Sequence, residues 1–168
     1  TASNIPTNVE TKIKSYSDGY AIDYKRLNTE TGSTVNVKKT MNITAADTDV
    51  LSLNMTNHMV DWGSGTKRID LILYATTTAG VKKFGEIRFA DTYAAIYDYD
   101  AETETFKSTS ASNVKLSAGT DRKIEIKIDY AKKTYTLFMD GTQVGIVANI
   151  PDYEYTEKLN HFTMDIIR

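Results

Sequence analysis

The sequence predicts an all-β domain built as a sandwich of two antiparallel sheets. Its 168 residues include eleven tyrosines and only two prolines, and threonine, isoleucine and valine are frequent, which favours strands. Segments in which apolar and polar residues alternate recur about every 8–15 residues, with turn signals between them, as in sandwiches and barrels. Patterns that could form a helix are few.

The clearest strand pair lies in "RKIEIKIDYAKKTYTLFMDGTQV". Ile124, Ile126 and Ile128 share one face of the first strand, and charged residues occupy the other, which is the period-two pattern of a strand with one buried side. "AKKT" makes the turn, the return strand alternates in the same way, and Asp140-Gly141 predicts a second tight turn. This stretch contains no reactive group, so we interpret it as scaffold.

Further strands are expected along the whole chain, in the segments "GYAIDYKRL", "STVNVKKTMNI", "DVLSLNMTNHMV", "KRIDLILYATT", "KKFGEIRFA", "YAAIYDYDAE" and "FTMDIIR". Residues 44–53 could open a helix, because Thr44 and Asp47 have capping-box spacing, and residues 152–161 could hold one short turn. The alternation predicts a core made of Ile69, Leu71, Leu73, Ile87, Phe89, Ile124, Ile126, Ile128, Leu137, Phe162, Met164 and Ile166.

Length and charge limit the function classes. The length favours one domain, with residues 1–15 as a polar, linker-like segment and 16–168 as the sandwich. A net charge of -2 disfavours nucleic acid and anionic membranes as partners. The absence of cysteine excludes disulfides and thiol catalysis. We expect a monomeric module of a larger secreted or cell-surface protein, whose signal peptide lies outside this sequence.

The late hairpin resembles that of concanavalin A-like (laminin-G-like) jelly rolls. Asp129, Thr134-Tyr135, Leu137 and the run from Asp140 to Val144 match its pattern, and the likeness extends over residues 48–168. Such domains serve as lectins, carbohydrate-binding modules, adhesion domains and glycan-cleaving enzymes. The sequence looks most like the accessory modules found beside bacterial polysaccharide lyases and glycoside hydrolases, which implies a polysaccharide or oligosaccharide ligand. The resemblance requires no cofactor, but many such modules carry a structural calcium ion, for which oxygens are available at Asp91, Asp98, Asp100 and Asp165.

Catalysis on such a fold would require particular sets of residues. A glycoside hydrolase needs two carboxylates about 5–9 Å apart in one cleft, and the nearest run is Asp98, Asp100, Glu102 and Glu104 in "YDYDAETE". We favour the interpretation of this run as a solvated strand end that enters a turn. A jelly-roll lyase needs a base with Arg and an amide, and His58, Tyr93 and Arg88 occur only singly. We therefore favour a non-enzyme, with hydrolase or lyase as one alternative and a structural or adhesion module without a glycan ligand as the other.

Four residues are the candidates for sugar binding: Trp62, Arg88, Tyr97 and Tyr99. Rings cover the apolar faces of pyranoses, and polar groups fix the hydroxyls. Trp62 lies among glycines and polar residues and could stack on a sugar or cap the sandwich. If Ile96 is core, Tyr97 and Tyr99 face outward, about 7 Å apart along a strand; if the tyrosines are core, there is no such platform. Arg88 would take hydroxyls or a carboxylate, or form a cross-strand ion pair.

Overall fold

The computed structural model describes residues 2–3, 9–16, 19–26, 34–45, 49–59, 68–90, 92–112 and 120–167, and the side chains of residues 36–45, 49–56, 68–90, 92–109 and 121–167. No helix occurs in these ranges, so none of them contains a helix long and apolar enough to cross a membrane. The strands, in chain order, are β1 (Ala2–Ser3), β2 (Val9–Tyr16), β3 (Gly19–Arg26), β4 (Thr34–Thr44), β5 (Val50–Met59), β6 (Arg68–Thr77), β7 (Gly80–Ala90), β8 (Tyr93–Asp100), β9 (Thr105–Ser112), β10 (Thr120–Asp129), β11 (Thr134–Met139), β12 (Thr142–Asn149) and β13 (Tyr155–Ile167).

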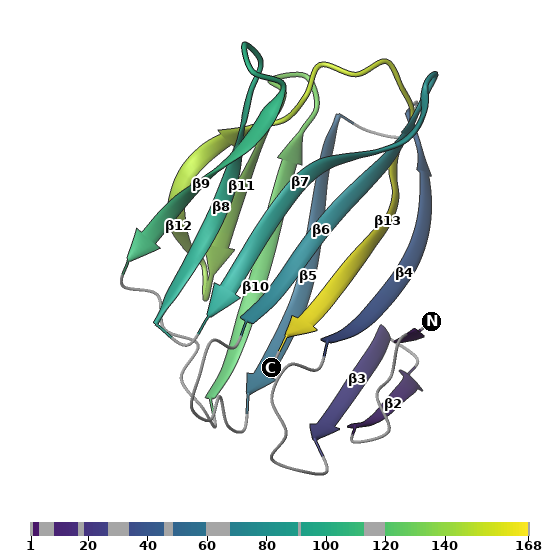
Figure 1. The fold of residues 1–168 in the computed structure, drawn as a ribbon, viewed down its shortest axis with the longest axis vertical. Helices are drawn as coiled ribbons and strands as arrows, with labels where there is room; N and C mark the ends of the chain where they lie inside the picture. The colour runs from purple at the N-terminus through teal and green to yellow at the C-terminus, as the bar shows by residue number, and fades with distance from the viewer. Residues whose placement is uncertain are drawn as a thin grey trace.

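The strands form a two-layer sandwich (Figure 1). The larger sheet has the order β1-β4-β13-β6-β7-β8-β9 and the smaller one β12-β11-β10-β5, while β2 and β3 pair as a separate hairpin. Each of these neighbours pairs antiparallel. The predicted all-β antiparallel sandwich is therefore confirmed. The division into residues 1–15 and 16–168 stays a prediction; β1 lies in the first segment, and β2 extends across the boundary to Tyr16.

The predicted scaffold hairpin is present with the predicted register. Ile126 pairs with Leu137, and Ile128 with Tyr135, so the apolar residues of β10 and β11 share the inner face. Asp140 and Gly141 form the next turn with φ of 49° and 81°. Two successive residues with positive φ make the turn whose twist matches a β-hairpin, and glycine adopts this conformation without steric cost.

The core fills the space between the two sheets. Nine of the twelve predicted core residues are buried there, together with Phe84, Ile96 and Tyr135. The prediction overestimated the burial of Phe162, Met164 and Ile166 on β13, which are only partly buried against this core. The seven-stranded sheet is wider than its four-stranded partner, so the inner side chains of β13 lie toward the part of the sheet that the partner does not fully cover.

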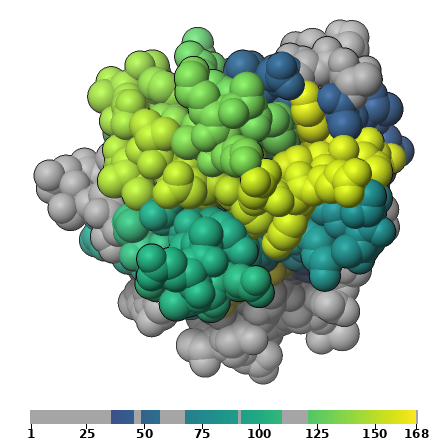
Figure 2. Space-filling view, turned by 90° about the horizontal axis from the view of Figure 1, so that it is seen from above, coloured from purple at the N-terminus to yellow at the C-terminus, as the bar shows by residue number. Residues whose placement is uncertain are grey.

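The segment after β12 closes one end of the sandwich. Seen from above, the yellow residues that lead into β13 cross between the green strands of the smaller sheet and the teal strands of the larger one (Figure 2). Tyr155 packs there edge-to-face against Phe84 and Tyr130, with ring centroids 6.4 and 5.3 Å away. The short turn expected within residues 152–161 is instead the start of β13.

Ile126→Asp should prevent folding, because Ile126 is fully buried and a carboxylate there would be an uncompensated charge in the core. The matched control is Ser52→Asp, since Ser52 is exposed and lies opposite Lys127 on the neighbouring strand. Circular dichroism and urea unfolding should show a native control and an unfolded Ile126→Asp. A cooperative transition for Ile126→Asp would contradict the assigned core.

Candidate functional site on the outer face of the larger sheet

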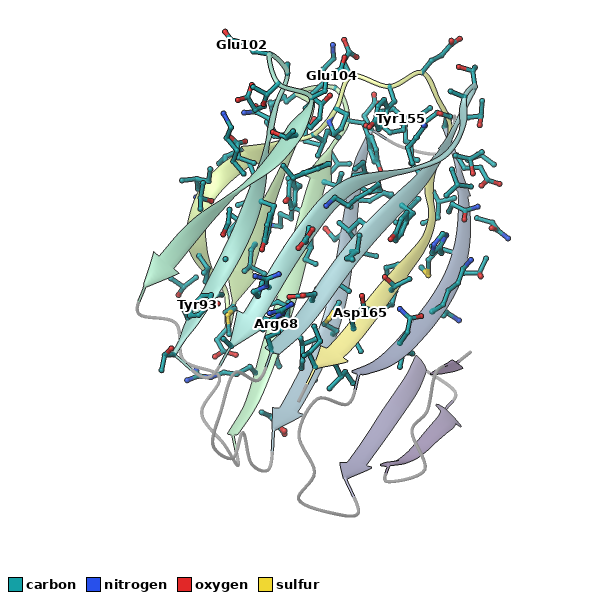
Figure 3. All side chains as sticks on the ribbon, viewed as in Figure 1. Arg68, Tyr93, Glu102, Glu104, Tyr155 and Asp165 are labelled. Atoms are coloured by element: carbon teal, nitrogen blue, oxygen red, sulfur yellow. The ribbon has the colours of Figure 1, made fainter. Side chains whose placement is uncertain are left out.

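Polar side chains gather on the face of the larger sheet that points away from the core. Asp70 of β6 lies directly opposite Arg88 of β7, and Asp165 of β13 lies opposite Asp70. Ala95 of β8 lies on the other side of Arg88. Because side chains on one face of a strand recur every second residue, Glu86 and Tyr97 belong to the same outer face. Figure 3 shows Arg68, Asp165 and Tyr93 toward the same end of this sheet.

A β-bulge in β7 produces this alignment. Leu73 pairs with Gly85 but Tyr74 pairs with Lys83, so Phe84 is an extra residue. Phe84 and Ile87 can then both enter the core, although they are three positions apart. Glycine suits position 85 at the bulge, because a Cβ there would make a tight contact of 3.2 Å with Leu73 Cδ1 and would touch the Tyr135 ring at 3.5 Å.

Five charged side chains form a chain of ion pairs on this face, which we call the ionic ladder: Arg68, Asp70, Arg88, Glu86 and Lys83. Arg88 donates to Asp70 through Nε (2.7 Å) and Nη2 (3.2 Å), and Arg68 Nε donates to Asp70 Oδ2 (3.0 Å). Lys83 donates to Glu86 Oε2 (2.6 Å), and Arg88 Nη2 lies 3.8 Å from Glu86 Oε1. The hydrogen bonds to Asp70 raise the pKa of Arg88. Asp70 and Glu86 are themselves buried.

Tyr97 lies beside the ladder. The Arg88 guanidinium carbon is 5.5 Å from the centroid of its ring, a cation–π distance. Burial raises the pKa of the Tyr97 hydroxyl, and the nearby Arg88 partly offsets this effect. Ile96 is core, which confirms the interpretation in which the tyrosines of β8 face outward. Arg88 and Tyr97, which were predicted separately, are therefore neighbours.

The Tyr135 hydroxyl supports this region from the opposite sheet. It accepts from the Glu86 amide (3.2 Å) and lies within donating distance of the Glu86 carbonyl (2.9 Å) and the Tyr97 carbonyl. The described pairing of β7 with β8 runs from Phe89–Ala94 to Ile87–Ile96. Just beyond that pairing, one buried hydroxyl thus holds the backbones of Glu86 and Tyr97 together. Burial raises the pKa of Tyr135, which keeps it a donor.

A second aromatic feature lies on the same face of β6 and β13. Tyr74 and His161 stack with ring centroids 4.5 Å apart and planes 12° apart. The His161 ring, which is buried, has its Nδ1 2.5 Å from Asn160 Oδ1. Burial and the positive charge of Lys38 lower the pKa of His161. His161 lies within β13, an inner strand of the larger sheet.

The remaining predicted site residues are placed differently. Trp62 lies outside the described residues. Tyr99 packs against Phe106 of β9, with ring centroids 5.3 Å apart, and Lys83 Nζ lies 4.3 Å from the centroid of Phe106. The set of Trp62, Arg88, Tyr97 and Tyr99 stays a prediction.

The acidic run considered for hydrolysis has structural contacts. Asp98 accepts from the backbone amide and the side-chain amide of Asn149 (2.6 and 2.9 Å), which joins β8 to β12. Asp100 accepts from the turn amides of Glu102 and Thr103 (2.9 and 3.3 Å) and pairs with Lys107, and these bonds lower its pKa to about 2. Glu102 and Glu104 lie at the end of the sheet opposite to Arg68 and Asp165 (Figure 3).

Neither the calcium nor the lyase expectation gains support. Within the described residues, no three His, Asp or Glu side chains are grouped to hold a metal ion, and Asp91 lies outside them. Of the lyase candidates, the His58 side chain lies outside the described residues, Tyr93 is half-buried, and Arg88 is ion-paired to Asp70. Calcium stays a prediction.

Sequence reasoning missed Asp70, Lys83, Tyr74 and His161 as parts of this face. One signal was available for Asp70, which alternates with Ile69 and Leu71 and must therefore point outward. Its pairing with Arg88 was not foreseeable without the bulge. The Tyr74–His161 stack joins strands more than eighty residues apart in the chain, and no local pattern predicts it.

Comparison with known proteins establishes the fold. No family model matches the sequence, and no curated protein is similar to it. Among solved structures, the chain is similar to the carbohydrate recognition domain of Emp46p in its potassium-bound form, with a TM-score of 0.57, 11% identity, 94% of this chain covered and 79% of that one. It is also similar to sheep galectin-11 in complex with glycerol, with a TM-score of 0.53, 6% identity and coverages of 84% and 96%.

A third similar structure is a sialidase, with a TM-score of 0.55, 11% identity and 80% of this chain covered. The chain spans only 11% of that protein's length. At these identities the likeness concerns the fold. The molecule is a concanavalin A-like jelly-roll sandwich, as the hairpin resemblance predicted.

Tyr135→Phe should lower the free energy of unfolding by about 1–3 kcal/mol, because it leaves buried backbone groups of Glu86 and Tyr97 without their partner. Tyr93→Phe is the control, since no described residue bonds its hydroxyl. Urea unfolding measures both changes. Equal stability of the two variants would contradict the bridging role of the Tyr135 hydroxyl.

The lowered pKa of His161 predicts acid sensitivity. The unfolded chain takes up this proton below about pH 6.5 and the folded chain only at lower pH. Stability that is complete above about pH 6.5 should therefore fall as the pH drops toward the folded pKa. His161→Gln should remove this slope in urea unfolding at several pH values. His58 is common to both proteins, so its contribution cancels, and an unchanged slope would contradict the prediction.

Proposed function

We propose that this domain is a non-catalytic carbohydrate-binding module that recognises a polysaccharide or oligosaccharide through the outer face of its larger sheet. The observation that carries the proposal is the adjacency of Arg88 and Tyr97 on a sheet face whose polar groups are held in place. Sugar recognition needs a ring surface together with a few fixed donors and acceptors. The fold shared with a carbohydrate recognition domain and a galectin supports the proposal.

The contacts of the carboxylates support binding rather than catalysis. Both oxygens of Asp70 accept hydrogen bonds from arginines, and Lys83 occupies one oxygen of Glu86. General acid–base work requires a carboxyl group free to exchange a proton with the substrate. Asp98 and Asp100 are likewise engaged with Asn149 and Lys107.

The setting we propose is a module within a larger secreted or cell-surface protein. The sialidase supports this, because a fold like that of the present chain accounts for 11% of its length. Within such a protein the domain would hold a neighbouring enzyme or surface region close to a glycan.

Affinity electrophoresis in gels containing polysaccharide, with glycan arrays beside it, tests the binding. Tyr97→Ala should weaken binding about ten-fold, since one stacking ring contributes roughly 1–2 kcal/mol. Trp62→Ala and Tyr99→Ala test the other two predicted rings. Phe138→Ala is the matched control, because Phe138 lies on the outer face of the smaller sheet, near Lys127. Equal binding by all four variants would place the site elsewhere, and no binding by the wild type would favour a structural or adhesion module.

We expect the domain to show no catalytic turnover of polysaccharides. Reducing-sugar release would reveal a hydrolase, and absorbance by unsaturated uronides would reveal a lyase. A signal lost in Asp98→Asn or Asp100→Asn would support hydrolysis, whereas one lost in His58→Ala or Arg88→Ala would support elimination. Either result would replace the binding proposal with an enzymatic one.

A further inference from the structure

We infer that the ligand at Arg88 is a neutral sugar that presents two adjacent hydroxyl groups, and not a uronate; this inference rests on the proposed function. The sequence alone leaves open whether Arg88 would bind sugar hydroxyls or a sugar carboxylate. Two features favour the hydroxyls over the carboxylate: the ionic ladder, and the hydrogen-bonding groups of Arg88 and Glu86 that the ladder does not use.

The positive charge of Arg88 is already compensated. Asp70 lies directly opposite it and accepts two hydrogen bonds from it, at 2.7 and 3.2 Å, while Glu86 Oε1 lies 3.8 Å from it. The ionic ladder around Arg88 contains three cations and two carboxylates, and a third carboxylate, that of Asp165, lies on the strand beyond Asp70. A second carboxylate brought to Arg88 would meet Asp70 and Glu86 at short range, and like charges repel more strongly where solvent is excluded.

The unused hydrogen-bonding groups suit hydroxyls. Within the described part of the chain, Arg88 Nη1 has no acceptor and Glu86 Oε1 has no hydrogen-bond donor, so one donor and one acceptor remain on neighbouring groups. A hydroxyl both donates and accepts, whereas an ionised carboxylate only accepts. Two adjacent hydroxyls could bond both groups, one accepting from Arg88 and the other donating to Glu86. A uronate carboxylate has no hydrogen to give to Glu86.

The support of these two groups makes them suitable for recognition. Lys83 holds the other oxygen of Glu86 at 2.6 Å, and the Tyr135 hydroxyl bonds the Glu86 backbone. Arg88 is held by Asp70 and lies against Tyr97. Groups ordered before binding lose little conformational entropy when a ligand arrives. This arrangement therefore favours a ligand with two adjacent hydroxyl groups over a ligand with a negative charge.

Affinity gels with neutral polysaccharides (xylan, galactan, mannan) and with polygalacturonate or alginate test the inference. The wild type should be retarded by a neutral polymer, with little change between about 50 mM and 0.5 M salt, because charge attraction is not involved. Asp70→Asn removes the negative charge that neutralises Arg88. This variant should bind a uronate polymer about ten-fold more tightly than the wild type, seen as stronger retardation in the gel. Asp152→Asn is the control of equal charge change, since Asp152 is exposed and pairs only with Lys133 among the described residues.

Competition with the wild type keeps the test independent of any variant's folding. A neutral hexose should displace the retained chain, whereas the corresponding uronic acid and a deoxy analogue lacking one of two adjacent hydroxyls should not. Salt-sensitive retardation of the wild type by uronates in preference to neutral polymers would overturn this inference and leave the proposed function standing. Retardation by no polymer would overturn both.

Discussion

The extra residue in β7 determines which side chains meet on the outer face of the larger sheet. The turn between β6 and β7 has two residues, so uninterrupted pairing would place Asp70 opposite Ile87, a polar residue beside a core residue. The bulge at Phe84 shifts the register by one position and places Asp70 opposite Arg88. It does so because Phe84 and Ile87 must both be buried. The hydrophobic core therefore sets the register, and the ionic ladder follows from it.

The core also reaches the outer face through Tyr135. Its ring is buried between the sheets and lies close to Gly85, and its hydroxyl bonds the backbone of Glu86 and Tyr97. The pairing of β7 with β8 alone does not extend to these two residues. A residue of the smaller sheet thus positions side chains on the far side of the larger one, and a change in the core can alter the proposed binding face without touching it.

The sequence was sufficient for the fold class, the β10–β11 hairpin with its turns and most of the core, because period-two alternation and Asp-Gly turns are local signals. It overestimated the burial of Phe162, Met164 and Ile166, since the relative widths of two sheets depend on pairings far apart in the chain. Arg88 and Tyr97 could be chosen singly from their chemistry. Their adjacency could not be predicted, because it depends on which strand lies beside β7 and on the bulge.

The two outer faces of the sandwich differ in a way that bears on where a ligand would bind. On the smaller sheet, Lys127 and Glu125 form a pair at 3.4 Å, with an exposed Lys127 and a partly exposed Glu125, and such pairs contribute little. On the larger sheet, Asp70 and Glu86 are buried although they point away from the core. Burying charges costs free energy that only several well-formed hydrogen bonds can offset, and the ladder supplies them. A face with buried, cross-linked polar groups is already ordered before a ligand arrives, and this physical difference is the reason for assigning recognition to the larger sheet.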